Sequence, residues 1–245
     1  MIKSNRRIYC AFINQRIFLT MLAKKYLSRV VSIKNHFEGI YTLEFESLNG
    51  KFKYHPGQFL HLAIDSQFDG SDQWPESRCF SMQSNPLEPT IKITYSVKGK
   101  FTRNMVNTIK VGSEVWLKLP YGDLFSQNHN KICTVFIAGG TGITPFLSLF
   151  SHDSFKDYIN PRIYLGFKSQ AYNIYTEALT NLKSEELKIY YEDVDGFINI
   201  NSVYDENSTA NDYFISGPPE MIKSFKHNLI TKGVSPNQIL TDEWN

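Results

Sequence analysis

The chain has 245 residues, of which 42% are hydrophobic and 20% charged, and its formal net charge is +2. This composition is typical of a globular protein with one large or two small domains, and the small net charge argues against nucleic acid as a partner. The three cysteines are scattered and form no C-x-x-C pair, which argues against a disulfide framework, a metal site or a cysteine-ligated iron–sulfur cluster, and favours a reducing, cytoplasmic setting.

Residues 1–25 form a basic leader, because they contain six lysines and arginines, and the first acidic residue of the chain is Glu38. Apolar residues between Ile8 and Leu22 could form a loose stripe on a helix. Such a helix can contact an anionic membrane surface, so peripheral membrane contact stays an alternative. The sequence favours a poorly ordered leader or a helix packed on the body. No run reaches the ~18 apolar residues that a transmembrane segment needs.

Residues 26–127 carry the pattern of a small antiparallel β-barrel. Short runs with β-branched or alternating apolar residues are separated by turn residues, with one helix expected near 101–109. The strand-like runs are 27–33, 39–45, 58–64, 90–97 and 114–120.

Residues 131–245 change to an alternation of strands and helices, which predicts an α/β domain with a parallel sheet. The expected strands are 132–138, 162–167, 188–192 and 212–216, and the expected helices are 145–151, 173–182 and 219–232. The fold class is therefore two-domain, a β-barrel followed by a parallel-sheet domain.

A glycine turn joins the first strand and helix of this second domain. Gly140, Thr141 and Gly142 follow an apolar run, and Pro145 suits the first turn of a helix because it lacks an N–H. Such a turn lets the backbone approach a phosphate, and ligands of parallel sheets bind beyond the carboxyl ends of the strands. An ordinary βα turn could have the same residues, so other parts of the sequence must show whether this turn binds a nucleotide phosphate.

Five short motifs occur in order along the chain: Arg78 to Ser81, Gly99 to Thr102, the glycine turn, Ser216 to Pro218, and Glu243 with Trp244. Together they resemble the ferredoxin–NADP reductase family of flavoenzymes across about residues 26–245. The resemblance implies an FAD-binding barrel at 26–127 and an NAD(P)-binding domain at 131–245.

On the flavin side, the guanidinium of Arg78 can hold a phosphate with two hydrogen bonds, and Phe80 can lie along the flavin ring. Ser81 can hydrogen-bond near the flavin N5 atom. The family usually has tyrosine where this chain has Phe80, so one contact is lost. By resemblance Gly99, Lys100 and Thr102 meet the FAD pyrophosphate.

On the nicotinamide side, the resemblance gives Gly140, Thr141, Gly142 and Pro145 to the pyrophosphate of the coenzyme. Ser216, Gly217 and Pro218 should approach the nicotinamide, with Ser216 where the family commonly has cysteine. Glu243 and Trp244 match the carboxylate and the aromatic side chain that close the flavin site in many members.

The choice between NADH and NADPH depends on the end of the second strand, where Lys168 could contact a 2′-phosphate. No second basic residue and no acidic residue follows in 170–173. The sequence therefore predicts weak discrimination with a slight preference for NADH.

The implied activity is hydride transfer from NADH or NADPH to FAD, followed by electron transfer to a ferredoxin, oxygenase or haem protein. Two alternatives stay open. The protein could be a flavin or quinone reductase with a diffusible acceptor, or a reductase-like nucleotide-binding subunit with little turnover.

Overall fold

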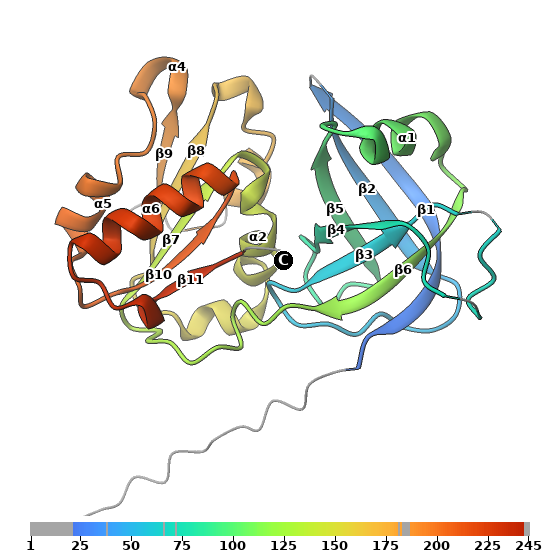
Figure 1. Cartoon of the computed structure of the whole chain (residues 1–245), viewed down its shortest axis with the longest axis horizontal. Coiled ribbons are helices and arrows are strands. Elements are labelled where there is room, and N and C mark those ends of the chain that lie inside the picture. The colour runs from blue at the N-terminus through green and yellow to red at the C-terminus, as the bar shows by residue number, and fades with distance from the viewer. Residues whose placement is uncertain are drawn as a thin grey trace, which may run out of the picture.

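The computed structural model describes residues 22–242 apart from 38, 66, 72, 181 and 183–186. Two sheets, one antiparallel and one parallel, form two domains that lie side by side (Figure 1). Most of the expected leader and the site candidates Glu243 and Trp244 lie outside the described residues.

The first domain is a six-stranded antiparallel sheet that curls into a barrel, with strand order β4-β3-β6-β1-β2-β5. Its edges meet where the backbone N–H of Gln83, just after β4, donates to the carbonyl of Lys92 in β5 at 2.9 Å. Side chains alternate along the strands, so that Leu60 and Leu62 are buried inside while His61 faces outward. The elements are β1 (Lys24–Phe37), β2 (Ile40–Ser47), β3 (Phe59–Ala63), β4 (Ser77–Ser81), β5 (Thr90–Ser96), α1 (Lys100–Thr108) and β6 (Glu114–Tyr121).

The second domain is a five-stranded parallel sheet with strand order β11-β10-β7-β8-β9, so β7 lies at its centre. Its strands are β7 (Thr134–Gly139), β8 (Arg162–Phe167), β9 (Leu187–Tyr191), β10 (Asp212–Ser216) and β11 (Ile239–Thr241). Its helices are α2 (Thr144–Phe150), α3 (Thr176–Leu179), α4 (Glu192–Asp195), α5 (Ile200–Asn207) and α6 (Pro219–Thr231).

Helices cover both faces of this sheet (Figure 1). Val135 and Ile137 of β7 belong to the core under α5 and α6, whereas Phe136 and Ala138 belong to the core that includes α2. Because both faces are buried, the strand is a continuous apolar run.

The two domains touch through α2 and through the loop after β8. The Ser148 hydroxyl donates to the carbonyl of Ser84 at 2.8 Å, and the side-chain amide of Asn85 donates to the carbonyl of Ser151 at 2.6 Å. The rings of Phe37 and Tyr172 meet edge to face with centroids 5.0 Å apart. These contacts hold the barrel against the carboxyl edge of the parallel sheet.

The predicted fold class is confirmed, and one predicted helix is largely wrong. Of the expected helix 173–182, the structure has only α3, preceded by a 3₁₀ turn at Gln170–Tyr172. The side-chain oxygen of Asn173 accepts the N–H of Tyr175 at 3.3 Å, and this Asx turn competes with a helical start. Strand β11 and helices α4 and α5 were not among the predicted elements. No helix in the described part of the chain is long and apolar enough to cross a membrane.

Candidate functional site

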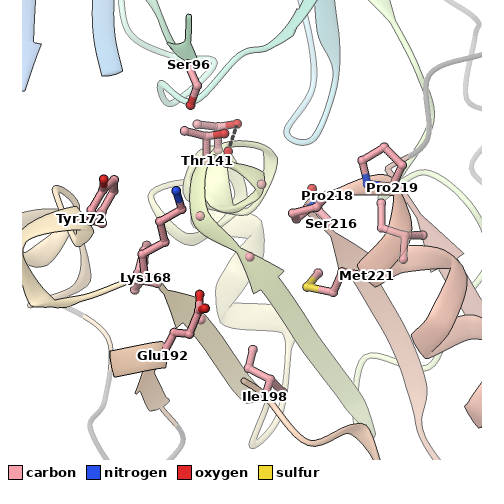
Figure 2. A pocket seen from close by; sticks show the side chains of 18 of the residues that line it. Ser96, Thr141, Lys168, Tyr172, Glu192, Ile198, Ser216, Pro218, Pro219 and Met221 are labelled. Atoms are coloured by element: carbon pink, nitrogen blue, oxygen red, sulfur yellow. Dashed lines mark hydrogen bonds between the residues drawn. The ribbon is translucent and has the colours of Figure 1, made fainter. Parts of the chain in front are cut away.

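A cleft of about 1240 Å³ opens between the two domains, at the carboxyl ends of β7, β8 and β10. Of the predicted site residues it is lined by Phe80, Ser81, Gly140, Thr141, Gly142, Lys168, Ser216, Gly217 and Pro218. Figure 2 shows Ser96 of the barrel directly above Thr141 of the α/β domain, with Lys168 and Ser216 lower down on either side. The topology therefore brings together residues that are far apart in the sequence.

The glycine turn after β7 packs directly on the turn after β10. A Cβ atom on Gly142 would lie 2.5 Å from the Cα of Gly217, so only glycine fits there. Gly140 has a φ of +55° and a Cβ on it would meet nothing within 4 Å, so its backbone faces open space. Pro145 is buried in the first turn of α2 and does not line the cleft.

Asp242 connects the two domains at the deep end of the cleft. The hydroxyls of Ser81, from β4, and of Ser216, at the end of β10, both donate to its Oδ2 atom, at 3.3 and 3.2 Å. Both serines are buried. Sequence reasoning chose Glu243 as the carboxylate here and missed Asp242, which directly follows β11 and could have been found as the adjacent acidic residue.

Phe80 is the aromatic residue that the described part of the barrel contributes to the cleft lining. It is buried and packs edge to face on Tyr95 behind it, with ring centroids 5.8 Å apart. Burial, together with the neighbouring Tyr41, raises the pKa of Tyr95 to about 12, so its hydroxyl stays neutral.

Arg78 and the start of α1 form a second group, which does not line the cleft. The guanidinium of Arg78 lies 5.0 Å over the Phe101 ring, is half exposed, and contacts Glu76 at 2.9 Å. The hydroxyl of Thr102 accepts the N–H groups of Lys98 and Gly99 at 3.0 and 3.2 Å, so it caps the helix. The structure thus brings Arg78 together with the helix terminus of Gly99, Lys100 and Thr102, where free N–H groups and a cation favour an anion.

Lys168 and Glu192 lie on the wall formed by β8 and β9 (Figure 2). The ammonium group of Lys168 is 5.4 Å from the Tyr172 ring centre. Parallel pairing of Phe167 with Tyr191 places the next residues, Lys168 and Glu192, at neighbouring strand ends. Sequence reasoning searched only 170–173 for an acidic residue and missed Glu192, although its place at the end of the predicted strand 188–192 was a usable signal.

Cys79 points away from the cleft, as its strand position predicts, because its Sγ atom lies 3.5 Å from Nε2 of His61 on the outer face of the barrel. Burial raises the pKa of the thiol and lowers that of the imidazole, so neither group is charged at neutral pH. Within the described ranges, no group of three or more histidine, cysteine and acidic side chains is arranged to hold a metal ion.

Comparison with known proteins relates this site to reductases. No protein-family model matches the chain. It is 28% identical over 216 residues to the propane 2-monooxygenase reductase component of Mycolicibacterium smegmatis, covering 80% of this chain and 60% of that protein. It is 24% identical over 246 residues to sulfhydrogenase 2 subunit gamma of Pyrococcus furiosus, covering 88% and 82%.

The fold superposes on a ferredoxin NADP⁺ reductase from Neisseria gonorrhoeae that has bound FAD and NADP. The TM-score is 0.73 at 16% identity, and the match covers 91% of this chain and 98% of that one. This likeness establishes the fold. The chain spans at most 60% of the length of the propane 2-monooxygenase reductase components that it matches.

Proposed function

We propose that the chain is an NAD(P)H-dependent FAD oxidoreductase of the ferredoxin–NADP reductase family that passes electrons to a partner protein, as its similarity to a monooxygenase reductase component and its fold support. The observation that carries the proposal is the cleft between the domains, in which Ser81 and Phe80 of the barrel face the glycine turns of the α/β domain. Its volume of about 1240 Å³ exceeds the roughly 300–1,000 Å³ of most small-molecule sites, as a site for two dinucleotide rings requires.

FAD fits the barrel residues. Arg78 and the free N–H groups at the start of α1 offer positive charge to a pyrophosphate, and no acidic residue stands in the first turn of that helix. The nearby ion pair with Glu76 is exposed, so a phosphate can replace that carboxylate at little cost. Phe80 gives a flat ring a surface to lie on.

A nicotinamide dinucleotide fits the glycine turns. Gly140 lines the cleft with open space where a side chain would begin, and Gly142 allows the turn to sit directly against Gly217. A pyrophosphate can therefore approach the backbone closely, at the end of the central strand. Thr141 and Pro218 line the same wall.

When bound, the two cofactors supply hydride transfer from nicotinamide to flavin and the release of electrons in single or paired steps. The protein residues orient the reacting rings. Asp242 accepts hydrogen bonds only, so it holds the hydroxyls of Ser81 and Ser216 with their oxygen lone pairs free to face a ligand. We propose Asp242 as a further carboxylate of the site, beside the role expected of Glu243. The proposed roles of Glu243 and Trp244 in closing the flavin site rest on the sequence alone.

Glu192 supports NADH as the preferred coenzyme. An acidic side chain near the adenosine ribose accepts its hydroxyls and repels a 2′-phosphate. Lys168, beside it on the same wall, would favour the phosphate, so the two groups oppose each other. The slight preference for NADH predicted from the sequence thereby gains a physical basis.

The electron acceptor follows from similarity to the reductase component of a propane monooxygenase, and we propose an oxygenase, ferredoxin or haem protein. Similarity to a subunit of a sulfhydrogenase supports the second candidate, a reductase-like nucleotide-binding subunit. A flavin or quinone reductase with a diffusible acceptor, a cytoplasmic location and membrane contact through residues 1–25 stay predictions.

Purified protein tests the proposal directly. An oxidoreductase of this kind is yellow, and NADH bleaches its flavin absorbance under argon. Reoxidation rates with candidate acceptor proteins and with quinones then separate the two enzyme functions. A colourless protein that still binds NAD⁺ would favour the nucleotide-binding subunit instead.

A further inference from the structure

Lys168 and Glu192 carry opposite charges at the ends of two neighbouring strands. The register of β8 and β9 sets Phe167 opposite Tyr191, one residue before each charge. Beyond the strands the two segments stay together, because the backbone N–H of Asp193 donates to the carbonyl of Lys168 at 3.3 Å. Neighbouring strands lie about 4.8 Å apart, well within the reach of a lysine side chain. Within the described ranges, however, neither Lys168 nor Glu192 takes part in an ion pair.

The ring of Tyr172 gives the lysine a different partner. The ammonium group of Lys168 lies 5.4 Å from the centre of this ring, a distance at which the face of an aromatic ring attracts a cation. Both side chains line the cleft together with Glu192. Figure 2 shows the ammonium group directed toward the glycine turn at Thr141, with the Glu192 carboxylate below it in this view. Since a cation–π contact at an exposed site is about as strong as an exposed ion pair, the ring can keep the lysine from the carboxylate.

The barrel helps to hold the Tyr172 ring in place. Phe37, at the end of β1, meets this ring edge to face, with centroids 5.0 Å apart and ring planes at 85°. The backbone N–H of Tyr172 donates to the carbonyl of Ser169 at 3.0 Å, which closes the 3₁₀ turn that carries the ring. The position of the ring therefore depends on a local turn and on the docking of the two domains.

We propose that Tyr172 is a positioning residue for the coenzyme: its ring holds the Lys168 ammonium group away from Glu192, so both charges stay available to the adenosine end of a nicotinamide dinucleotide. This inference rests on the proposed function, in which Glu192 accepts the ribose hydroxyls of NADH and Lys168 contacts the 2′-phosphate of NADPH. Without the ring the two side chains pair with each other. Either coenzyme must then break that ion pair before it makes its own contact.

The variant Tyr172→Leu removes the ring. Calorimetric titration of FAD-loaded protein with NAD⁺ and with NADP⁺ measures the consequence, and we expect roughly two- to fivefold weaker binding of each, as breaking one exposed ion pair requires. Tyr172→Phe keeps the ring and should bind both coenzymes as the wild type does. Should Tyr172→Leu not fold, Phe37→Leu, which removes the support of the ring at a half-exposed site, takes its place and is judged by the same criteria.

Two backgrounds separate this role from a general disturbance of the cleft. In Glu192→Gln the lysine has no carboxylate to pair with, so adding Tyr172→Leu should not weaken NADP⁺ binding further. In Lys168→Ala the carboxylate has no ammonium group to pair with, so adding Tyr172→Leu should not weaken NAD⁺ binding further. A purely structural effect of losing the ring would persist in both backgrounds, because it does not depend on the two charges.

Tyr204→Leu is the matched control, because the ammonium group of Lys232 lies 4.7 Å from the Tyr204 ring centre and this pair does not line the cleft. It should leave both coenzyme affinities unchanged. Affinities of Tyr172→Leu equal to wild type, or losses that persist in both backgrounds, would overturn the role of Tyr172 alone. Wild-type FAD-loaded protein that binds neither coenzyme would overturn the proposed function together with it.

Discussion

Gly142→Ala tests whether the packing of the two glycine turns shapes the nicotinamide side of the cleft. The added Cβ would lie 2.5 Å from Cα and 2.6 Å from N of Gly217, and 2.7 Å from the carbonyl carbon of Ser216, whereas ordinary contacts begin near 3.4 Å. All three are backbone atoms, so the turn after β10 must move by roughly 1 Å. Overpacking of this kind costs about 1–3 kcal/mol. If that strain falls on the nucleotide-binding conformation, affinity for NAD⁺ drops roughly 5- to 150-fold.

Calorimetric titration with NAD⁺ measures this loss, and the FAD content should stay at the wild-type level because Arg78 and α1 are remote from the turn. Gly140→Ala is the control, since its Cβ meets nothing within 4 Å and only the positive φ costs energy, about 1–2 kcal/mol. NAD⁺ affinity and thermal stability of Gly142→Ala equal to wild type would refute the steric argument. Equal losses in both variants would assign the effect to backbone conformation.

Three further outcomes follow from the same geometry. Arg78→Ala should lose FAD on gel filtration, because a charge-assisted hydrogen bond worth about 1.5–3 kcal/mol disappears, and a wild-type ratio of flavin to protein would contradict the assignment. Glu192→Gln should raise kcat/KM with NADPH and lower kcat/KM with NADH, whereas Lys168→Ala should lower kcat/KM with NADPH. If steady-state kinetics show the same ratio of kcat/KM for NADPH and NADH as wild type in both variants, these two residues do not select the coenzyme. Burial lowers the pKa of His129, so the unfolded chain binds more protons and stability falls as pH drops below about 6.5. Urea unfolding at pH 5 and 8 should show a smaller difference in His129→Gln.

The fold was predictable where local pattern and tertiary role agree. The apolar run before the glycine turn became the central strand β7, because a strand buried on both faces needs apolar residues throughout. Strand β4 was expected only from the Arg78 motif, because its five residues are flanked by polar loops and it is defined by pairing, as Leu60 opposite Phe80 illustrates. Helix α5 was missed because its eight residues are mostly polar and only Ile200 and Val203 contribute apolar side chains to the core.

The sequence motifs of the candidate site could be predicted, but the contacts between residues that lie far apart in the sequence could not. The glycine turns and the Arg78 motif can be recognised from short stretches of sequence, because a phosphate site needs backbone N–H groups and a cation at short spacing. Asp242 and Glu192 meet the other site residues only through sheet order and domain docking. The hydrogen bond between Ser81 and Asp242 joins residues that are 161 positions apart in the sequence. Local sequence patterns carry no information about contacts between residues so far apart.

The hydrogen-bond polarity of the cleft is itself an argument about its ligand. The hydroxyls of Ser81 and Ser216 donate their protons to Asp242, so their oxygen lone pairs are left to accept hydrogen bonds. The end of the cleft beside Asp242 can therefore accept a hydrogen bond from an N–H of a ligand. A ligand that binds at this end is therefore expected to carry N–H donors. Since the accepting serines come from different domains and share one carboxylate, the accepting end of the site exists only while barrel and α/β domain are docked.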